Sequence, residues 1–264
     1  MAREAVHEER ADGVATVTLR RPEKMNAYNS SMLAELLAVL DEIARDETIR
    51  AVVLTGEGRA FCAGADVQDV DALLSLQHEL SADKDILKLL NATILALRRL
   101  PKPIIAAVNG VAAGGGANLV LACDIVIASE KARFAENFIN IGLIPDGGGT
   151  FFVPAQIGYQ RAAEIFFTGR ILSAQEALAV GLYNRVVPPE ELMRAVGDLA
   201  RDLAARPTRA IAACKAAMNR EAISRLEAYL AEEARYQRAM VLTQDAREGI
   251  MAFTEKRKPV FLGK

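Results

Sequence analysis

Short apolar stretches typical of buried strands alternate with longer amphipathic stretches along the first half of the chain. The stretch AVVLTG, residues 51–56, is almost continuously apolar, as strands buried on both faces are. Residues 30–46 and 85–100 repeat apolar side chains at three- and four-residue steps, which indicates helices, the first behind a serine cap. Further strands are expected at 13–19, 103–110 and 124–129. This alternation predicts an α/β fold in which crossover helices connect the strands of a sheet.

The pattern changes from about Gly158 onward, where the sequence becomes mostly helical. A capping box is expected at Ser173–Glu176, and long amphipathic stretches continue to about residue 248. We therefore divide the chain into a sheet-based core, residues 1–200, and a helical C-terminal part, residues 201–264. A chain of 264 residues is long enough to bury a full hydrophobic core.

The charge balance and the cysteines disfavour several classes of protein. The chain carries 32 basic and 34 acidic residues, so there is no electrostatic reason to expect a nucleic acid or an anionic membrane as partner. Its cysteines, Cys62, Cys123 and Cys214, are widely spaced and form no C-x-x-C pair, so we expect neither a metal site nor a disulfide framework. The N-terminus lacks the apolar core of a signal peptide, and no apolar run reaches the ~18 residues of a membrane span. We expect a cytoplasmic protein with reduced thiols.

Two glycine-bearing segments follow expected strands and offer main-chain N–H groups to a ligand. In RAFCAGADVQDV, residues 59–70, Gly64 lies among small residues, although a tight turn explains it equally well. In NGVAAGGGANLVLACD, residues 109–124, three glycines lead into an expected helix, whose first turn has free N–H groups; close helix packing is the alternative explanation. The dinucleotide pattern G-x-G-x-x-G fails at Leu119 and no G-K-[ST] phosphate loop exists, which disfavours nucleotide cofactors. Together the two segments can donate two hydrogen bonds to one carbonyl oxygen.

Asp146 is the only charged residue in IGLIPDGGGT, residues 141–150. An Asp-Gly turn is the simplest interpretation of this position. Its apolar neighbours, among them Pro145 and Phe151, predict instead that desolvation raises the pKa of the carboxyl group. Such a shift would make Asp146 a better base near neutral pH, so it is a candidate proton carrier.

Six stretches occur in an order that resembles one known family. They are RPEKMNAYN, FCAGADV, PKPIIAAVNGVAAGGGANLVLACDIVIAS, GLIPDGGGT, FTGRILSAQEALAVGLYNRVV and REGIMAFTEKRKPVF, and they span residues 21–261. The family is the crotonase superfamily of enoyl-CoA hydratases and isomerases. The resemblance implies an α/β fold with a repeated ββα spiral core that binds an acyl-CoA thioester, and a helical C-terminal part that packs in a homotrimer or homohexamer. It implies no cofactor beyond coenzyme A, which is part of the substrate.

The resemblance also assigns roles to individual residues. The oxyanion donors carry over to the main-chain N–H groups of Ala65 and Gly115. The expected substrate-binding residues are Lys24, Ala27, Ala63, Asp66, Val67, Asn118, Phe138, Phe253 and Lys256. Lys24, Lys256 and Arg257 would meet the phosphates of coenzyme A, the last two from a neighbouring subunit, although charged surface residues are the ordinary alternative. The segment 68–86 is expected to cover the acyl pocket.

The chain departs from the hydratase pattern at the two positions where those enzymes carry a glutamate. Asn118 occupies the first position and Phe138 the second, with Glu136 two residues away. Adding water requires both a base and an acid, whereas moving a double bond requires one proton carrier. Hydratases of the family carry glycine at the position of Asp146. Isomerases such as the ring 1,2-epoxyphenylacetyl-CoA isomerases of phenylacetate breakdown carry an aspartate there, as this chain does. The sequence therefore predicts an acyl-CoA isomerase with Asp146 as acid and base; an atypical hydratase and a catalytically silent CoA-ester binder are the alternatives.

Overall fold

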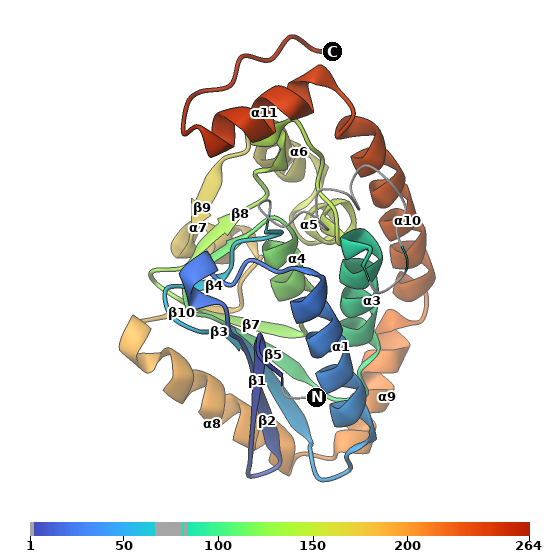
Figure 1. The fold of residues 1–264 in the computed structure, drawn as a ribbon. Helices are drawn as coiled ribbons and strands as arrows, with labels where there is room; N and C mark the ends of the chain where they lie inside the picture. The colour runs from blue at the N-terminus through green and yellow to red at the C-terminus, as the bar shows by residue number, and fades with distance from the viewer. Residues whose placement is uncertain (1–2, 67–80, 82–83) are drawn as a thin grey trace.

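Two sheets organise the chain in a computed structural model that describes residues 3–66, 81 and 84–264 (Figure 1). The larger sheet has the strand order β1-β2-β3-β5-β7-β10, and the smaller has the order β4-β6-β8-β9. Neighbouring strands are parallel except for β1 with β2 and β8 with β9. The strands are β1 Val6–Ala11, β2 Val14–Leu19, β3 Ala51–Gly56, β4 Ala60–Cys62, β5 Ile104–Val108, β6 Val111–Ala113, β7 Ile125–Ser129, β8 Arg133–Ala135, β9 Ile171–Ser173 and β10 Arg185–Val187.

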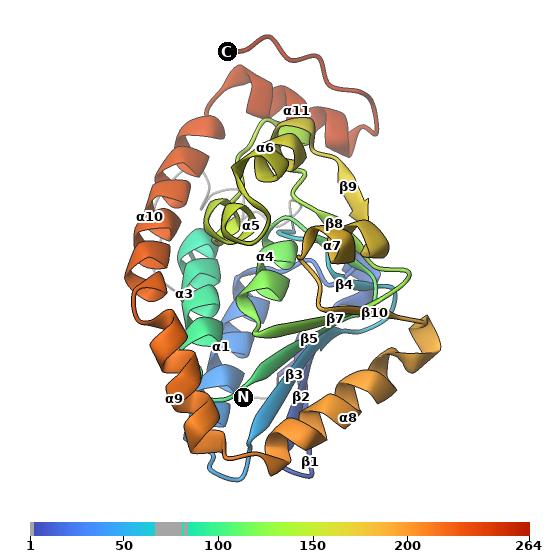
Figure 2. The same cartoon turned by 180° about the vertical axis from the view of Figure 1, so that it is seen from behind.

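The helices surround these sheets, and the last three of the chain run up one side of the molecule and across its top (Figure 2). They are α1 Ser30–Arg45, α3 Ile86–Arg99, α4 Gly115–Ala122, α5 Gly149–Ile157, α6 Tyr159–Thr168, α7 Ala174–Val180, α8 Leu192–Ala205, α9 Thr208–Asn219, α10 Ala222–Met240 and α11 Gln244–Thr254. Short 3₁₀ turns occur at η1 Pro22–Lys24, η2 Phe138–Ile141 and η3 Pro189–Glu191. None of the helices in the described ranges combines the length and apolar character needed to cross a membrane.

A ββα unit repeats three times and confirms the expected core. In each repeat the first strand (β3, β5 or β7) joins the large sheet, and the second (β4, β6 or β8) joins the small one. A helix follows later in each repeat: α3, α4 or α5. Because equivalent strands are parallel neighbours, the segments that follow β4 and β6 lie side by side, and these segments carry the two glycine motifs.

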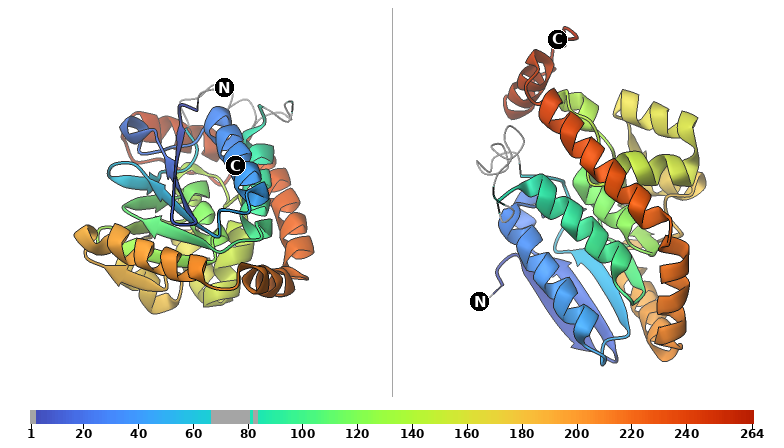
Figure 3. Two further views of the ribbon diagram at one scale, coloured as in Figure 1. Left: turned by 90° about the horizontal axis from the view of Figure 1, so that it is seen from below. Right: turned by 90° about the vertical axis from the view of Figure 1, so that its right-hand side faces the viewer.

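The large sheet is covered on both faces, which explains its continuously apolar strands. Along β3, Val52 and Leu54 face the core shared with α1 and α3, whereas Ala51 and Val53 face α8. Figure 3 shows the result in its left-hand view, with α8 on one side of the sheet and α1 and α3 on the other. Its right-hand view shows α10 running alongside α3, a contact that brings the C-terminal helices to the core.

The expected strands and helices are confirmed, with three differences. The first helix is capped by Asn29, whose side chain accepts a hydrogen bond from the Met32 N–H at 3.0 Å, and not by a serine, because Ser30 already lies within the helix. The mostly helical region contains β9 and β10, and β10 completes the large sheet. The division expected at residue 200 falls inside α8, which packs on that sheet and ends at Ala205. The capping box at Ser173 and Glu176 is confirmed.

Candidate active site

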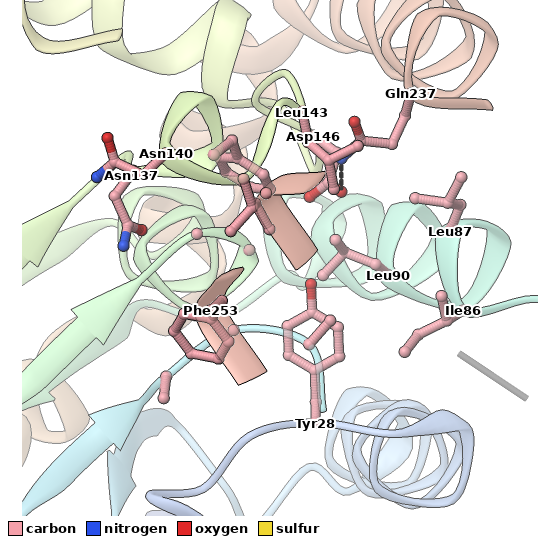
Figure 4. A pocket seen from close by; sticks show the side chains of 18 of the residues that line it. Tyr28, Ile86, Leu87, Leu90, Asn137, Asn140, Leu143, Asp146, Gln237 and Phe253 are labelled. Carbon is pink, nitrogen blue, oxygen red and sulfur yellow. Dashed lines mark hydrogen bonds between the residues drawn. The ribbon is translucent and has the colours of Figure 1, made fainter. Parts of the chain in front are cut away.

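A cavity of about 420 Å³ lies where the glycine segments, α3 and the C-terminal helices meet. This volume suits a small ligand or the acyl part of a larger one. Figure 4 shows the side chains around it, with Tyr28 below, Leu90 of α3 at one side and Asp146 above. Of the residues expected at the site, seven line the cavity: Ala63, Ala65, Gly115, Phe138, Asp146, Phe253 and Arg257.

The main chain on one side of the cavity presents two free N–H groups. Neither the Ala65 nor the Gly115 N–H donates a hydrogen bond to any residue of the described ranges. Each follows a glycine with a positive φ, Gly64 at 97° and Gly114 at 53°, a conformation that disfavours any side chain. Gly115 is also the first residue of α4, where the helix dipole favours negative charge. Both residues line one cavity, as binding of a single oxygen by their N–H groups requires.

Asp146 lies on the same cavity, buried, with a carboxyl group in two different environments. Its Oδ2 accepts a hydrogen bond from Nε2 of Gln237 at 2.9 Å, whereas its Oδ1 is buried and has no partner among the described residues. Burial raises the pKa of Asp146 to about 6, although the bond from Gln237 favours the ionised form. The expected direction of this shift is confirmed, and its cause is desolvation.

Helix α10 holds the Asp146 segment with two side chains one turn apart. Gln237 donates to the Asp146 carboxylate and also accepts the Ile144 N–H at 3.2 Å. Glu233 accepts the N–H groups of Gly148 and Thr150 at 2.7 and 2.9 Å, at the start of α5. Burial raises the pKa of Glu233 to about 7, against the effect of these hydrogen bonds. Helix α10 thus fixes the chain on both sides of Asp146.

Asn118 and Glu136 lie behind the cavity wall and do not line the cavity. Asn118 is fully buried, and its Nδ2 donates to the main-chain oxygen of Asp146 at 2.7 Å, so it supports the Asp146 segment. Glu136 is also fully buried, and neither of its carboxyl oxygens has a hydrogen-bond partner in the described ranges. Burial, together with the nearby charges of Asp146 and Glu233, raises the pKa of Glu136 well above its usual value. Two residues later, Phe138 does face the cavity, beside Gly114.

The other expected substrate-binding residues are spread around the site. Asp66 is buried and pairs with Arg21 at 2.8 Å, and Arg21 also donates to the main-chain oxygen of Ala27. Lys24 and Lys256 are exposed and do not line the cavity. Phe253 stands at the mouth, 64% exposed. Val67 and most of the segment 68–86 lie outside the described residues.

Three residues of the site were not anticipated from the sequence: Tyr28, Glu233 and Gln237. Tyr28 follows the RPEKMNA motif and could have been suspected from that position alone. Glu233 and Gln237 lie on a charged amphipathic helix, where such residues usually face solvent. Their partners lie 83 to 93 residues earlier, so nothing in their local sequence indicates the contact.

Known proteins resemble this chain in sequence over nearly its full length. The model of the family described as enoyl-CoA hydratase/isomerase matches residues 9–264. The chain is 43% identical over 254 residues to the 1,2-epoxyphenylacetyl-CoA isomerase of Escherichia coli (strain K12), covering 96% of each chain. It is also 43% identical over 265 residues to a probable enoyl-CoA hydratase of Rhodobacter capsulatus, covering 100% of each.

Solved structures agree with the sequence comparisons. The crystal structure of an enoyl-CoA hydratase from Mycobacterium avium subsp. paratuberculosis K-10 superposes with a TM-score of 0.88 at 32% identity, covering 98% of this chain and 99% of that one. An enoyl-CoA hydratase/isomerase from Pseudoalteromonas atlantica T6c also gives 0.88, at 30% identity, covering 98% and 100%. With its three ββα repeats and its paired main-chain amides, the chain belongs to the enoyl-CoA hydratase/isomerase family of the crotonase superfamily.

Proposed function

We propose that this protein is an acyl-CoA isomerase that moves a double bond, or isomerises a ring epoxide, with Asp146 as its acid and base. The observation that carries the proposal is that Asp146 is the only carboxylate among the described residues that line the cavity. One proton carrier is enough for isomerisation, whereas addition of water requires a base for water and an acid for carbon.

In double-bond migration the thioester oxygen accepts hydrogen bonds from the N–H groups of Ala65 and Gly115. Asp146 then removes a proton from the α-carbon of a 3-enoyl thioester, and the electron pair moves onto the oxygen as a dienolate. Each amide contributes roughly 3 kcal/mol to stabilising this charge. The protonated Asp146 returns its proton to the γ-carbon, which leaves the double bond conjugated with the thioester. A pKa of about 6 keeps the carboxylate ionised at neutral pH yet basic.

The environment of Asp146 supports a proton-transfer role over a turn-forming one. Its Oδ2 is held by Gln237, while its Oδ1 is buried and has no hydrogen-bond partner within residues 3–66, 81 and 84–264. A buried carboxylate oxygen without a partner is costly, and such groups concentrate at functional sites. The names of the relatives include both isomerases and hydratases and do not discriminate between the two reactions.

An assay with matched thioesters tests the proposal. Purified protein is offered 3-hexenoyl-CoA and 2-hexenoyl-CoA, and conjugation and hydration are followed by absorbance. We expect conjugation of the 3-enoyl thioester to fall at least about 100-fold in Asp146→Asn. The exposed Asp198→Asn on α8 is the control and should behave as the wild type.

The alternatives predict different outcomes of the same assay. Hydration that survives in Asp146→Asn would indicate a hydratase of unusual design. Tight binding of both thioesters without either reaction would indicate a silent CoA-ester binder. Conjugation that survives in Asp146→Asn would remove Asp146 from the mechanism.

We further propose that the protein acts as a homotrimer or homohexamer in the cytoplasm, without a cofactor beyond the coenzyme A of its substrate. Large apolar side chains on the later helices support self-association, because Phe167 of α6 is 72% exposed and Met218 of α9 is 68% exposed. Lys24, Lys256 and Arg257 would bind the phosphates of coenzyme A. Light scattering coupled to size exclusion tests the assembly, and a mass of one chain would contradict it.

A further inference from the structure

Tyr28 lies beside both amide segments of the proposed catalytic site, and its side chain points toward Asp146 across the cavity. Its main chain pairs with the first amide segment, because its N–H donates to the oxygen of Gly64 at 2.8 Å and its own oxygen accepts the Asp66 N–H at 2.9 Å. Its side chain is almost completely buried and lines the cavity. In Figure 4 the ring rises from below the cavity and the hydroxyl points toward Leu90 and Asp146.

The Tyr28 hydroxyl lies directly beside the second amide segment. A Cβ atom built on Gly115 would stand 2.1 Å from the hydroxyl oxygen, so only glycine fits at this position. Within the described part of the chain, the hydroxyl has no hydrogen-bond partner. Burial and the Asp146 carboxylate raise the pKa of Tyr28 well above its usual value, so the phenol keeps its proton and can act as a donor.

Neither Asp146 nor the thioester oxygen accounts for this donor. Oδ2 of Asp146 already accepts from Gln237, and no hydrogen bond joins Oδ1 to Tyr28. A carbonyl oxygen has two lone pairs, and the N–H groups of Ala65 and Gly115 are sufficient to occupy both. A phenylalanine would fill the same space without placing a hydrogen-bond donor on the cavity, whereas the Tyr28 hydroxyl is accessible from it. The hydroxyl therefore suits an acceptor atom on the acyl group, which must pass between Tyr28 and Asp146.

We propose that Tyr28 is a specificity-determining residue that donates a hydrogen bond to an oxygen atom carried by the acyl group. The substrate class is then an oxygen-bearing acyl thioester, with an oxo, hydroxyl or epoxide oxygen close to the thioester. This inference rests on the proposed function for the placement of the thioester, and it adds a selection among acyl groups that the two amides and Asp146 do not provide.

Direct binding measurements test the inference independently of turnover. Isothermal titration compares 3-oxohexanoyl-CoA with hexanoyl-CoA, which differ only in the acyl oxygen. The wild type should bind the oxygen-bearing thioester about 10-fold more tightly, and Tyr28→Phe should bind both alike. Tyr229→Phe, which removes a hydroxyl from a residue outside the cavity, is the matched control and should keep the preference.

Other outcomes would overturn the inference. A wild type without a preference, or a preference that persists in Tyr28→Phe, would show that Tyr28 does not contact an acyl oxygen. An equal loss of affinity for both thioesters in Tyr28→Phe would assign the hydroxyl to the shared thioester oxygen. Thermal unfolding adds a second readout, because a hydroxyl without an internal partner should not stabilise the fold, and a clear drop in melting temperature in Tyr28→Phe would indicate a structural role. Since binding does not require isomerisation, the result stands even if the assay of Asp146→Asn fails.

Discussion

The two halves of the candidate site are built in different ways. The half that presents Ala65 and Gly115 consists of main chain, held by the parallel pairing of β4 with β6 and by glycines with positive φ. The half that presents Asp146 consists of a side chain, held by Gln237 and Glu233 of α10 and by Asn118 of α4. The first half depends on the core sheets and the second on the docking of a distant helix.

The two halves therefore differ in how far amino-acid substitutions can change them. Main-chain donors cannot be changed by exchanging side chains, except where a new Cβ displaces the backbone. The carboxylate half offers several replaceable partners, each of which affects the pKa or the position of Asp146. We therefore expect substitutions that displace an amide to abolish activity, as loss of the Asp146 carboxylate itself would, and substitutions of the side chains that hold Asp146 to modulate it.

The largest effect is expected from Gly115→Ala in the amide half. The new Cβ would stand 2.1 Å from the Tyr28 hydroxyl and 3.1 Å from Cδ2 of Leu90, so the Gly115 main chain, the Tyr28 ring or both must shift. We expect the main chain to give way in part and to carry its N–H with it. Displacing one oxyanion donor costs about 10²–10³ in kcat. Steady-state kinetics on 3-hexenoyl-CoA measures the loss.

A glycine elsewhere provides the control for this substitution. Gly197 is a half-buried residue of α8, and a Cβ added there would meet only the end of the Arg201 side chain, at 3.3 Å. Gly197→Ala should leave kcat unaltered and stabilise the helix slightly. If Gly115→Ala kept full activity with its fold intact, the assignment of its N–H to the oxyanion would be wrong.

A smaller effect is expected from Gln237→Met in the carboxylate half. This change keeps the volume of the side chain but removes the hydrogen bond to Oδ2 of Asp146, which favours the ionised form. The pKa of Asp146 should therefore rise from about 6, by on the order of one unit. Since the base must be ionised, the acidic limb of the kcat/KM profile should move to higher pH, with about a 5-fold loss at pH 6.

The exposed Gln175→Met of α7 serves as the control, and its profile should match that of the wild type. A profile of Gln237→Met that keeps the wild-type midpoint but lies lower at every pH would mean that Gln237 positions Asp146 without tuning its charge.

The same contrast explains which features could be predicted from the sequence. The glycine segments carry their signal locally, because a positive φ or a free helix terminus depends on a few adjacent residues. The strands at 51–56, 103–110 and 124–129 could also be predicted from the sequence, because burial on both faces leaves continuous apolar runs. Even the misplaced cap differs by one residue, because Asn29 and Ser30 both suit an N-cap.

Features that depend on long-range packing could not be predicted in this way. Gln237 contacts a loop more than 90 residues earlier, and β10 joins the large sheet after a region that reads as helical. The burial of Glu136 illustrates the limit most clearly, because a carboxylate in the run ARFAENF suggests an exposed position. Burial has the largest effect on its pKa, and the charges of Asp146, on a later loop, and of Glu233, on α10, add to it.

The smallest effect is expected from Glu136→Gln, and it concerns stability and not catalysis. This substitution tests how much the buried carboxyl group of Glu136 contributes to the pH dependence of stability. Burial raises the pKa of Glu136 in the folded state, so the folded protein holds this proton more tightly than the unfolded chain does. The free energy that this tighter proton binding contributes to folding is fully present below the unfolded-state pKa of about 4.3. It is lost as the pH rises toward the folded-state pKa. Asp146 and Glu233, with raised pKa values of about 6 and 7, act in the same direction. The free energy of unfolding of the wild type should therefore fall as the pH rises from 4 to 8.

Glutamine cannot ionise, so the fall should be shallower in Glu136→Gln, and at pH 8 the variant should match or exceed the wild type by on the order of 1 kcal/mol. Urea unfolding at pH 4, 6 and 8 measures the difference, with the exposed Glu23→Gln as a control that should follow the wild type. A variant that lost stability equally at every pH would show that Glu136 makes a hydrogen bond that glutamine cannot replace. A shallower decrease of the free energy of unfolding with pH in Glu136→Gln would show that ionisation of buried carboxyl groups near Asp146 destabilises the fold. The unfavourable charge would then lie in the carboxylate half, where a base with a raised pKa is required, and not beside the amides, whose donors carry no net charge.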